Sequence, residues 1–221
     1  MSIWHDSPPK ISDLERAARF GYDSQFFNLL DKISYKNEMQ EWNPLHFAAY
    51  YGRYNWIEPL IERGFQINVL SKDGYSPLIC AISGKSTSVL PVLLTKGADL
   101  YLTDHLLKTA LHHVAWIGFQ EGFDFLNQHI LDVDQVDIQG MTPLHWALRG
   151  NHFKIAQGLI QKTYSPWAKN HMEQTPYDLA MDCQYEPIVD QMRARVDFLT
   201  LNHCIKSQSP LLSLEQEIRR L

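Results

Sequence analysis

The sequence predicts an all-α fold, a solenoid of helix-turn-helix units with short projecting turns. One motif recurs at a fixed step of 33 residues, an alanine follows each copy at a nearly constant distance, and glycine and proline punctuate every unit. The copies are Asn43-Pro44-Leu45-His46, Ser76-Pro77-Leu78-Ile79, Thr109-Ala110-Leu111-His112, Thr142-Pro143-Leu144-His145 and Thr175-Pro176-Tyr177-Asp178. Because each such unit buries its apolar face only against its neighbours, we expect one elongated domain.

The first full unit shows how two helices are specified. Asn43 can cap the first helix, and Pro44 fits its first turn, where a missing N–H costs nothing. Gly52 then breaks the chain, and Gly64 ends the second helix in the conformation that favours glycine. The inward residues of that second helix are Ile57, Leu60 and Ile61, and later units repeat the pattern with Val89, Leu93, Leu94, Phe123, Leu126, Ile155, Leu159, Ile160, Ile188, Val189 and Met192.

Some residues depart from this pattern. Pro59 falls inside an expected second helix and should kink or shorten it. Lys85 and Gln184 replace the glycine between the two helices of their units, whereas Asn151 reaches left-handed geometry more easily than most residues do.

The ends of the chain extend the repeat. We expect residues 1–10 to form an N-terminal lead, 11–38 an N-terminal capping repeat, and 39–205 five repeats of which the last is a C-terminal cap. Residues 206–221 should form a linker followed by a short amphipathic helix over 213–221, for which Ser213 and Gln216 make a weak capping box.

The motif resembles that of the ankyrin-repeat family, whose 33-residue unit carries Thr-Pro-Leu-His-x-Ala at the start of its first helix. The resemblance covers roughly residues 39 to 205. It implies an ankyrin solenoid whose turn tips and first helices form a concave surface. It also implies that His46, His112 and His145 hydrogen-bond the turn backbone that links repeats.

Composition excludes several function classes. A net charge of −5 argues against the broad basic surface that binds nucleic acid, and no uncharged run is long enough to span a bilayer. Three scattered cysteines without paired spacing favour a reducing compartment, so we expect a cytoplasmic protein. We expect no cofactor, no membrane insertion and a monomer.

Candidate chemical sites are weak. Stacked repeats place equivalent histidines too far apart to share one metal ion, so no metal is predicted. Cys80 and His113 occupy equivalent positions in adjacent units, but the sequence shows no third group or oxyanion pocket around them. Asp132, Asp134 and Asp137 lack the pattern of a calcium loop and are expected to be solvated turn residues. We therefore predict no enzyme.

Apolar residues recur where the repeat pattern expects exposure. Exposed aromatic residues bury much area at small entropic cost when a partner binds, so their clustering indicates a binding surface. The predicted partner-binding residues are Trp42, Tyr50, Tyr51, Tyr75, Leu106, Lys108, Trp116, Ile117, Met141 and Arg149.

The predicted function is therefore non-catalytic binding of another protein on a concave aromatic surface. The chain is similar in style to ankyrin proteins that intracellular bacteria deliver into host cells, which would place it in a host cytosol. A eukaryotic cytoplasmic adaptor or regulatory subunit is the alternative, with the tail from Pro210 to Leu221 docking into another protein as a helix. A Cys/His enzyme that uses Cys80 or Cys183 is a further alternative, which requires a thiol of lowered pKa.

Overall fold

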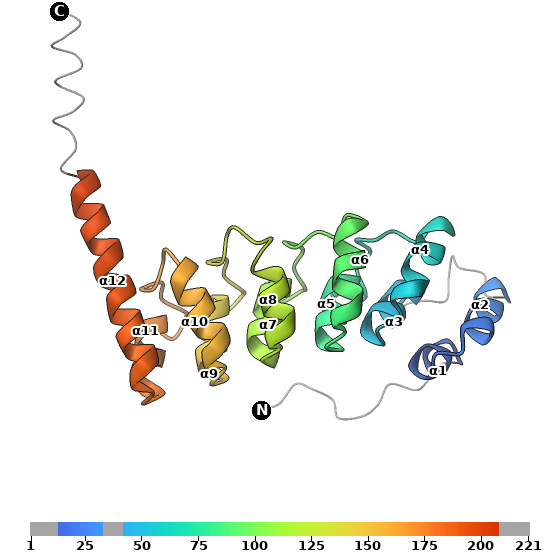
Figure 1. Ribbon diagram of the computed structural model, residues 1–221, viewed down its shortest axis with the longest axis horizontal. Helices are drawn as coiled ribbons and strands as arrows, with labels where there is room; N and C mark the ends of the chain where they lie inside the picture. Colours follow the sequence, from blue (N-terminus) through green and yellow to red (C-terminus); the bar gives the residue numbers. More distant parts are fainter. Residues whose placement is uncertain (1–12, 33–41, 208–221) are drawn as a thin grey trace, which may run out of the picture. The chain divides into compact units, whose positions relative to one another are not determined.

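The computed structural model describes residues 13–32 and 42–207 of the chain, and those residues form helices and turns (Figure 1). No strand occurs among them, and the single isolated β-bridge joins Thr103 to Thr109. The prediction of an all-α fold is confirmed. The chain divides into unit 1, Met1–Ile130, and unit 2, Leu131–Leu221, which are described separately.

The described residues of unit 1 form four helix pairs, in each of which the two helices pack against one another. The first pair lies in the predicted capping repeat, and α1 packs against the first helix of the next pair. The helices are α1 (Asp13–Phe20), α2 (Asp23–Lys32), α3 (Pro44–Tyr50), α4 (Tyr54–Glu62), α5 (Pro77–Ser83), the 3₁₀ helix η1 (Thr87–Val89), α6 (Leu90–Thr95), α7 (Ala110–Ile117) and α8 (Gln120–Leu126).

The first helices of consecutive pairs pack side by side, α3 on α5 and α5 on α7. Glycine permits the closest approach in this row. A Cβ atom added to Gly84, the residue after α5, would lie 2.0 Å from the carbonyl oxygen of Tyr50 at the end of α3. The neighbouring Ser86 hydroxyl donates a hydrogen bond to that same oxygen at 2.8 Å. The end of α3 is therefore held directly against the following repeat.

Unit 2 contains two further pairs, in which α9 packs on α10 and α11 on α12. Contacts of α9 with α11 and of α10 with α12 join the two pairs. The helices are α9 (Pro143–Arg149), α10 (Phe153–Lys162), α11 (Pro176–Asp182) and α12 (Glu186–Ser207).

The motif residues start the first helices as expected. The Asn43 side chain accepts the His46 N–H at 3.1 Å, and His46 Nδ1 accepts the Asn43 N–H at 3.0 Å. The same reciprocal capping joins Thr142 to His145 in unit 2. Two N–H groups that the helix itself leaves unpaired are satisfied at each of these starts.

The break between paired helices requires a left-handed residue. Gly52 and Gly118 have φ of 73° and 69°, and the non-glycine residues at the equivalent positions adopt the same region. Lys85, Asn151 and Gln184 have φ of 51°, 56° and 52°. Side chains with a Cβ atom are strained there, so the repeat geometry prevails over local preference at these positions.

Two expectations about individual elements change. Pro59 lies within α4, which continues through it from Tyr54 to Glu62, so the proline does not end the helix early. The final helix α12 extends to Ser207, which makes the first two residues of the expected linker helical. The predicted N-terminal lead and the predicted helix over 213–221 lie outside the described residues.

Candidate functional site

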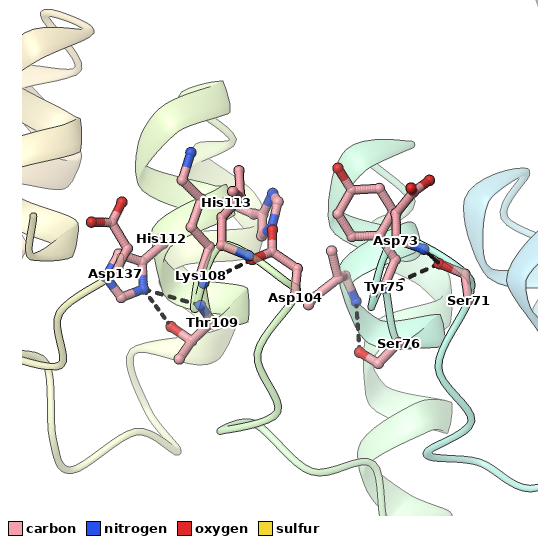
Figure 2. Close-up of polar contacts among 12 residues, drawn as sticks. Ser71, Asp73, Tyr75, Ser76, Asp104, Lys108, Thr109, His112, His113 and Asp137 are labelled. Carbon is pink, nitrogen blue, oxygen red and sulfur yellow. Dashed lines mark hydrogen bonds and ion pairs between the residues drawn. The ribbon is translucent and has the colours of Figure 1, made fainter. Parts of the chain in front are cut away.

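Four projecting turns of the described chain are each organised by one buried polar side chain. Four such residues follow one another at steps of 33, Ser71 and Asp104 in unit 1 and Asp137 and Asn170 in unit 2, and all four are buried. Each accepts two backbone N–H groups, from the residues two and four positions later, at 2.8 to 3.3 Å. Figure 2 shows these contacts around Ser71 and Asp104. The turn tips are therefore preformed.

In the third repeat this turn residue also binds a histidine of the following helix. The Asp104 carboxylate lies 3.0 Å from His113 Nε2, and both side chains are 3% exposed (Figure 2). Burial alone would raise the pKa of Asp104, but the hydrogen bonds from His113 and from the backbone N–H groups of Lys108 and Leu106 hold it below its usual value.

The histidines of the motif are structural in the two repeats where both ring contacts are seen. His46 Nδ1 accepts a backbone N–H, so its Nε2 carries the proton and donates to the Tyr75 carbonyl at 2.8 Å. Nε2 of His145 makes the same contact with the Gln174 carbonyl at 3.2 Å. Burial lowers the pKa of His46 to about 4, and it also lowers the pKa of His145.

Metal binding gains no support from this arrangement. Among residues 13–32 and 42–207, no group of three or more His, Cys, Asp or Glu side chains is placed to hold an ion. The expectation of solvated turn aspartates is wrong for Asp137, which is 3% exposed and accepts the indole N–H of Trp146 at 2.8 Å. Asp134 is partly buried and accepts the Thr163 hydroxyl at 2.5 Å and the Tyr164 N–H at 2.7 Å.

The predicted aromatic residues of the first repeat lie together. The Trp42 ring centroid is 5.3 Å from that of Tyr50, and the Tyr50 centroid is 5.0 Å from that of Tyr51. The Tyr51 hydroxyl donates to Glu15 of α1 at 3.1 Å. Burial, followed by the Glu15 charge, raises the pKa of Tyr51 to about 12. All three rings are half-buried, and Tyr51 also joins the first helix pair to the second.

Two turn tips carry the next predicted residues. Tyr75 is half-buried, with its ring edge-on to His113 at a centroid distance of 5.6 Å, and burial raises its pKa to about 12. Leu106 is 49% exposed, and Lys108 is half-buried beside it. Trp116 and Ile117 end α7 and are both half-buried.

The remaining two predicted residues belong to unit 2. Met141 is 2% exposed, so the expectation that it lies on the surface is wrong. The turn around Asp137 explains the burial of Met141. The Asp137 carboxylate accepts a hydrogen bond from the Met141 N–H, and the Met141 sulfur accepts one from the Asn170 side-chain amide at 3.1 Å. Arg149 is exposed at the end of α9, with its guanidinium 5.7 Å from the Trp146 ring centroid.

Neither described thiol is activated. Cys80 is fully buried, and burial raises its pKa. Burial, followed by the charge of Asp182, also raises the pKa of the half-buried Cys183. His113, the expected partner of Cys80, is hydrogen-bonded to Asp104 instead. A nucleophilic thiol requires the opposite shift, and the Cys204 side chain lies outside the described residues.

Sequence reasoning missed two features. The buried turn series recurs at the step of 33, so the period that revealed the motif could have revealed it too. Leu107 and Glu173 have φ of 58° and 61° where the equivalent residues Gly74 and Gly140 are glycines, and the Leu107 side chain is 50% exposed. Only the missing glycine in that register could have indicated this strain.

Comparison with known proteins agrees with the repeat geometry. The family model for ankyrin repeats in three copies matches residues 14–104 and 86–170. The chain belongs to the ankyrin-repeat family. Its helices build an all-α ankyrin-repeat solenoid, and ankyrin repeats are general protein–protein interaction modules whose family is generally non-catalytic.

Curated relatives share only part of their length with this ankyrin-repeat chain. It is 32% identical over 139 residues to the Homo sapiens neurogenic locus notch homolog protein 1, which covers 62% of this chain and 5% of that protein. It is 35% identical over 143 residues to the Homo sapiens transient receptor potential cation channel subfamily A member 1, covering 62% of this chain and 13% of the channel. Of the helices described in this chain, none has the length and apolar character to cross a membrane.

Proposed function

We propose that unit 1 binds a partner protein through its aromatic surface, the set Trp42, Tyr50, Tyr51, Tyr75, Leu106, Lys108, Trp116 and Ile117. The observation that carries the proposal is the tip of the third repeat. There Leu106 and Leu107 are adjacent and each is about half exposed. The turn that carries them is fixed by the buried Asp104 carboxylate, which accepts two of its backbone N–H groups. Two neighbouring exposed leucines on a fixed turn favour a contact role, because clustered exposed apolar side chains are typical of binding surfaces.

The physical basis is preorganisation. The tips are held by buried hydrogen bonds and the first helices by packing, so association orders few groups and loses little conformational entropy. Lys72 and Asp73 are exposed on the turn that carries Tyr75, and together with Lys108 they supply a polar rim of mixed sign. Such a rim selects the orientation of a partner more than it adds affinity.

The proposed binding fits either of two cellular settings. A bacterial effector in a host cytosol and a eukaryotic cytoplasmic adaptor both require only a preformed surface that binds protein, and a monomer suffices for either. The enzyme alternative is not favoured, because both described thiols have raised pKa values.

The test compares surface variants with a matched control in the full chain. Leu106→Ala and Trp116→Ala remove side chains of the aromatic surface, whereas Tyr54→Ala removes a side chain of intermediate size that is 56% exposed on α4. Partners captured from eukaryotic lysate by the wild type are purified, and their affinities for each variant are measured by titration calorimetry. A central contact residue should cost about 2 kcal/mol or more, roughly a thirtyfold weaker dissociation constant.

Circular dichroism must first show that all variants are equally helical. Weaker binding of a purified partner by both surface variants, with Tyr54→Ala unchanged, is the expected result. If Tyr54→Ala weakens binding as much as Trp116→Ala does, or if neither surface variant changes it, the aromatic surface is not the binding site.

A further inference from the structure

Unit 2 contains an open groove that the aromatic surface does not use. Its volume is about 300 Å³, and it lies between the chain that precedes α11, α11 itself and the middle of α12. The lining is largely apolar, with one cation and one carboxylate. The lining consists of Pro166, Trp167, Thr175, Tyr177, Arg193, Val196 and Asp197.

Hydrogen bonds within unit 2 fix the walls of this groove. Arg195 of α12 donates from Nε and Nη2 to the Thr163 carbonyl at 2.8 and 2.7 Å, and its guanidinium lies 5.5 Å from the Tyr164 ring centroid. Arg193 donates to the Tyr177 hydroxyl at 3.3 Å, which ties α12 to α11. The groove is therefore preformed and does not depend on a ligand to shape it.

Apolar surface continues from the groove toward the end of α12. Trp167 is 51% exposed at the groove, and Leu201 is 62% exposed. Leu201 follows Asp197 by four residues, so both lie on the same face of the helix. An apolar segment that runs back along this face would contact Leu201 first and the groove afterwards.

We propose that the segment Pro210–Glu217 of this same chain occupies the groove. It begins three residues after α12 ends at Ser207 and carries three leucines, Leu211, Leu212 and Leu214. Val196 lies 11 residues before Ser207, about 17 Å along a helix. The leucines follow Ser207 by four to seven residues, and an extended chain of that length covers about 13 to 23 Å. The reach of the leucines therefore matches the position of the groove.

Charge is consistent with the same direction of approach. Arg193 is the cation of the lining and lies about 21 Å before Ser207 along α12. Glu215 and Glu217 follow the leucines, so a chain that returns along α12 brings carboxylates toward this guanidinium, which also pairs with Asp190 at 3.4 Å. An exposed pair of this kind adds orientation more than affinity.

The test uses the full chain with a photo-crosslinking amino acid in place of Leu212. Irradiation should join position 212 to residues 163–177 or 193–201 of the same molecule, as identified by mass spectrometry of a mixture of isotopically labelled and unlabelled protein. Trp167→Ala should reduce the yield of this crosslink at least severalfold, because Trp167 lines the groove. It should leave helicity unchanged, because the Trp167 side chain is half exposed. A crosslink only between labelled and unlabelled copies would assign the groove to a second copy and overturn the proposal, and so would the absence of any crosslink to the groove.

Hydrogen exchange provides the independent readout. In the triple variant Leu211→Asp/Leu212→Asp/Leu214→Asp, amides of 163–177 should exchange about tenfold faster than in the wild type. The bound segment would protect the backbone around the groove from local opening, and the variant loses this protection. The matched control Ser209→Asp/Ser213→Asp/Gln216→Asp adds the same charge, keeps the leucines and should exchange as the wild type does. Equal exchange in all three proteins would refute the proposal.

Discussion

Units 1 and 2 can be compared position by position, because a step of 33 residues relates their repeats. The turn residue is polar and buried in both, with Ser71 and Asp104 in unit 1 and Asp137 and Asn170 in unit 2. Positions at the ends of the first helices behave differently. Tyr50, Ser83 and Trp116 in unit 1 correspond to Arg149 and Asp182 in unit 2, and only the two residues of unit 2 are exposed.

The comparison separates what maintains the fold from what can serve a partner. Positions that satisfy backbone groups keep their chemistry in both units, because an unpaired buried N–H costs about 1–3 kcal/mol wherever it occurs. Positions without that duty are free to differ, and two of the three in unit 1 hold aromatic residues. Differences between equivalent helix-end positions therefore point to binding, and shared buried polar residues point to folding.

The largest expected effect removes the shared turn residue in unit 1. Asp104→Ala leaves the N–H groups of Leu106 and Lys108 and the His113 ring without their acceptor, and should lower the free energy of unfolding by about 3 kcal/mol. Urea denaturation followed by circular dichroism measures the loss. Asp73→Ala on an exposed tip should stay within about 0.5 kcal/mol. A loss for Asp104→Ala no larger than this control would show that the turn contacts do not maintain the fold.

The next effect depends on pH and concerns the motif histidine. Burial lowers the pKa of His46 to about 4 from the ordinary 6.5, so the unfolded chain binds the proton more readily than the folded one. The contribution of His46 is complete above pH 6.5 and declines as the pH falls toward 4. Between pH 7 and pH 5 it should decrease by about 2 kcal/mol.

His46→Gln provides the control for this titration. Glutamine at this position can still accept the Asn43 N–H of the capping box but does not titrate. Urea denaturation at pH 7 and pH 5 should show a smaller pH dependence for this variant, by the same amount of about 2 kcal/mol. An equal pH dependence of the free energy of unfolding in the variant and the wild type would mean that His46 takes up its proton as readily in the folded chain as in the unfolded chain.

The smallest effect tests the strained leucine against its counterpart in unit 2. Leu107 and Glu173 have φ of 58° and 61°, so Leu107→Gly and Glu173→Gly should each raise the free energy of unfolding by about 1 kcal/mol as strain is relieved. Thermal denaturation measures this gain. Only Leu107→Gly should weaken the binding of a partner captured by the wild type. Equal binding by both variants would show that Leu107 does not contact the partner.

Much of the fold could be predicted from the sequence, because its determinants are local and periodic. Pro44 and Asn43 specify a helix start by backbone chemistry alone, and the step of 33 places every later start. The shortening expected at Pro59 did not occur, because a proline in a short helix removes one hydrogen bond while packing of α4 on α3 and α6 supports the rest. The structural role of the motif histidines was also predictable from their identical placement.

The candidate surface could be predicted only in part. Period and residue type selected Leu106 and Trp116, but they also selected Met141, which the turn around Asp137 buries. Asp137 itself was expected to be solvated, since a carboxylate in a turn is usually exposed to solvent. The indole N–H that it accepts belongs to Trp146, nine residues later. Neither helical periodicity nor turn patterns relate residues at that separation.

The sequence by itself determined the repeat, its helix starts, its left-handed breaks and hence the ankyrin family, because these follow from backbone preferences that each unit expresses alone. Tertiary structure decided which side chains are exposed and which polar groups pair. The Asp104–His113 pair, the burial of Met141 and the groove of unit 2 all depend on how neighbouring elements pack, and burial and hydrogen bonding between elements are properties of several chain segments at once.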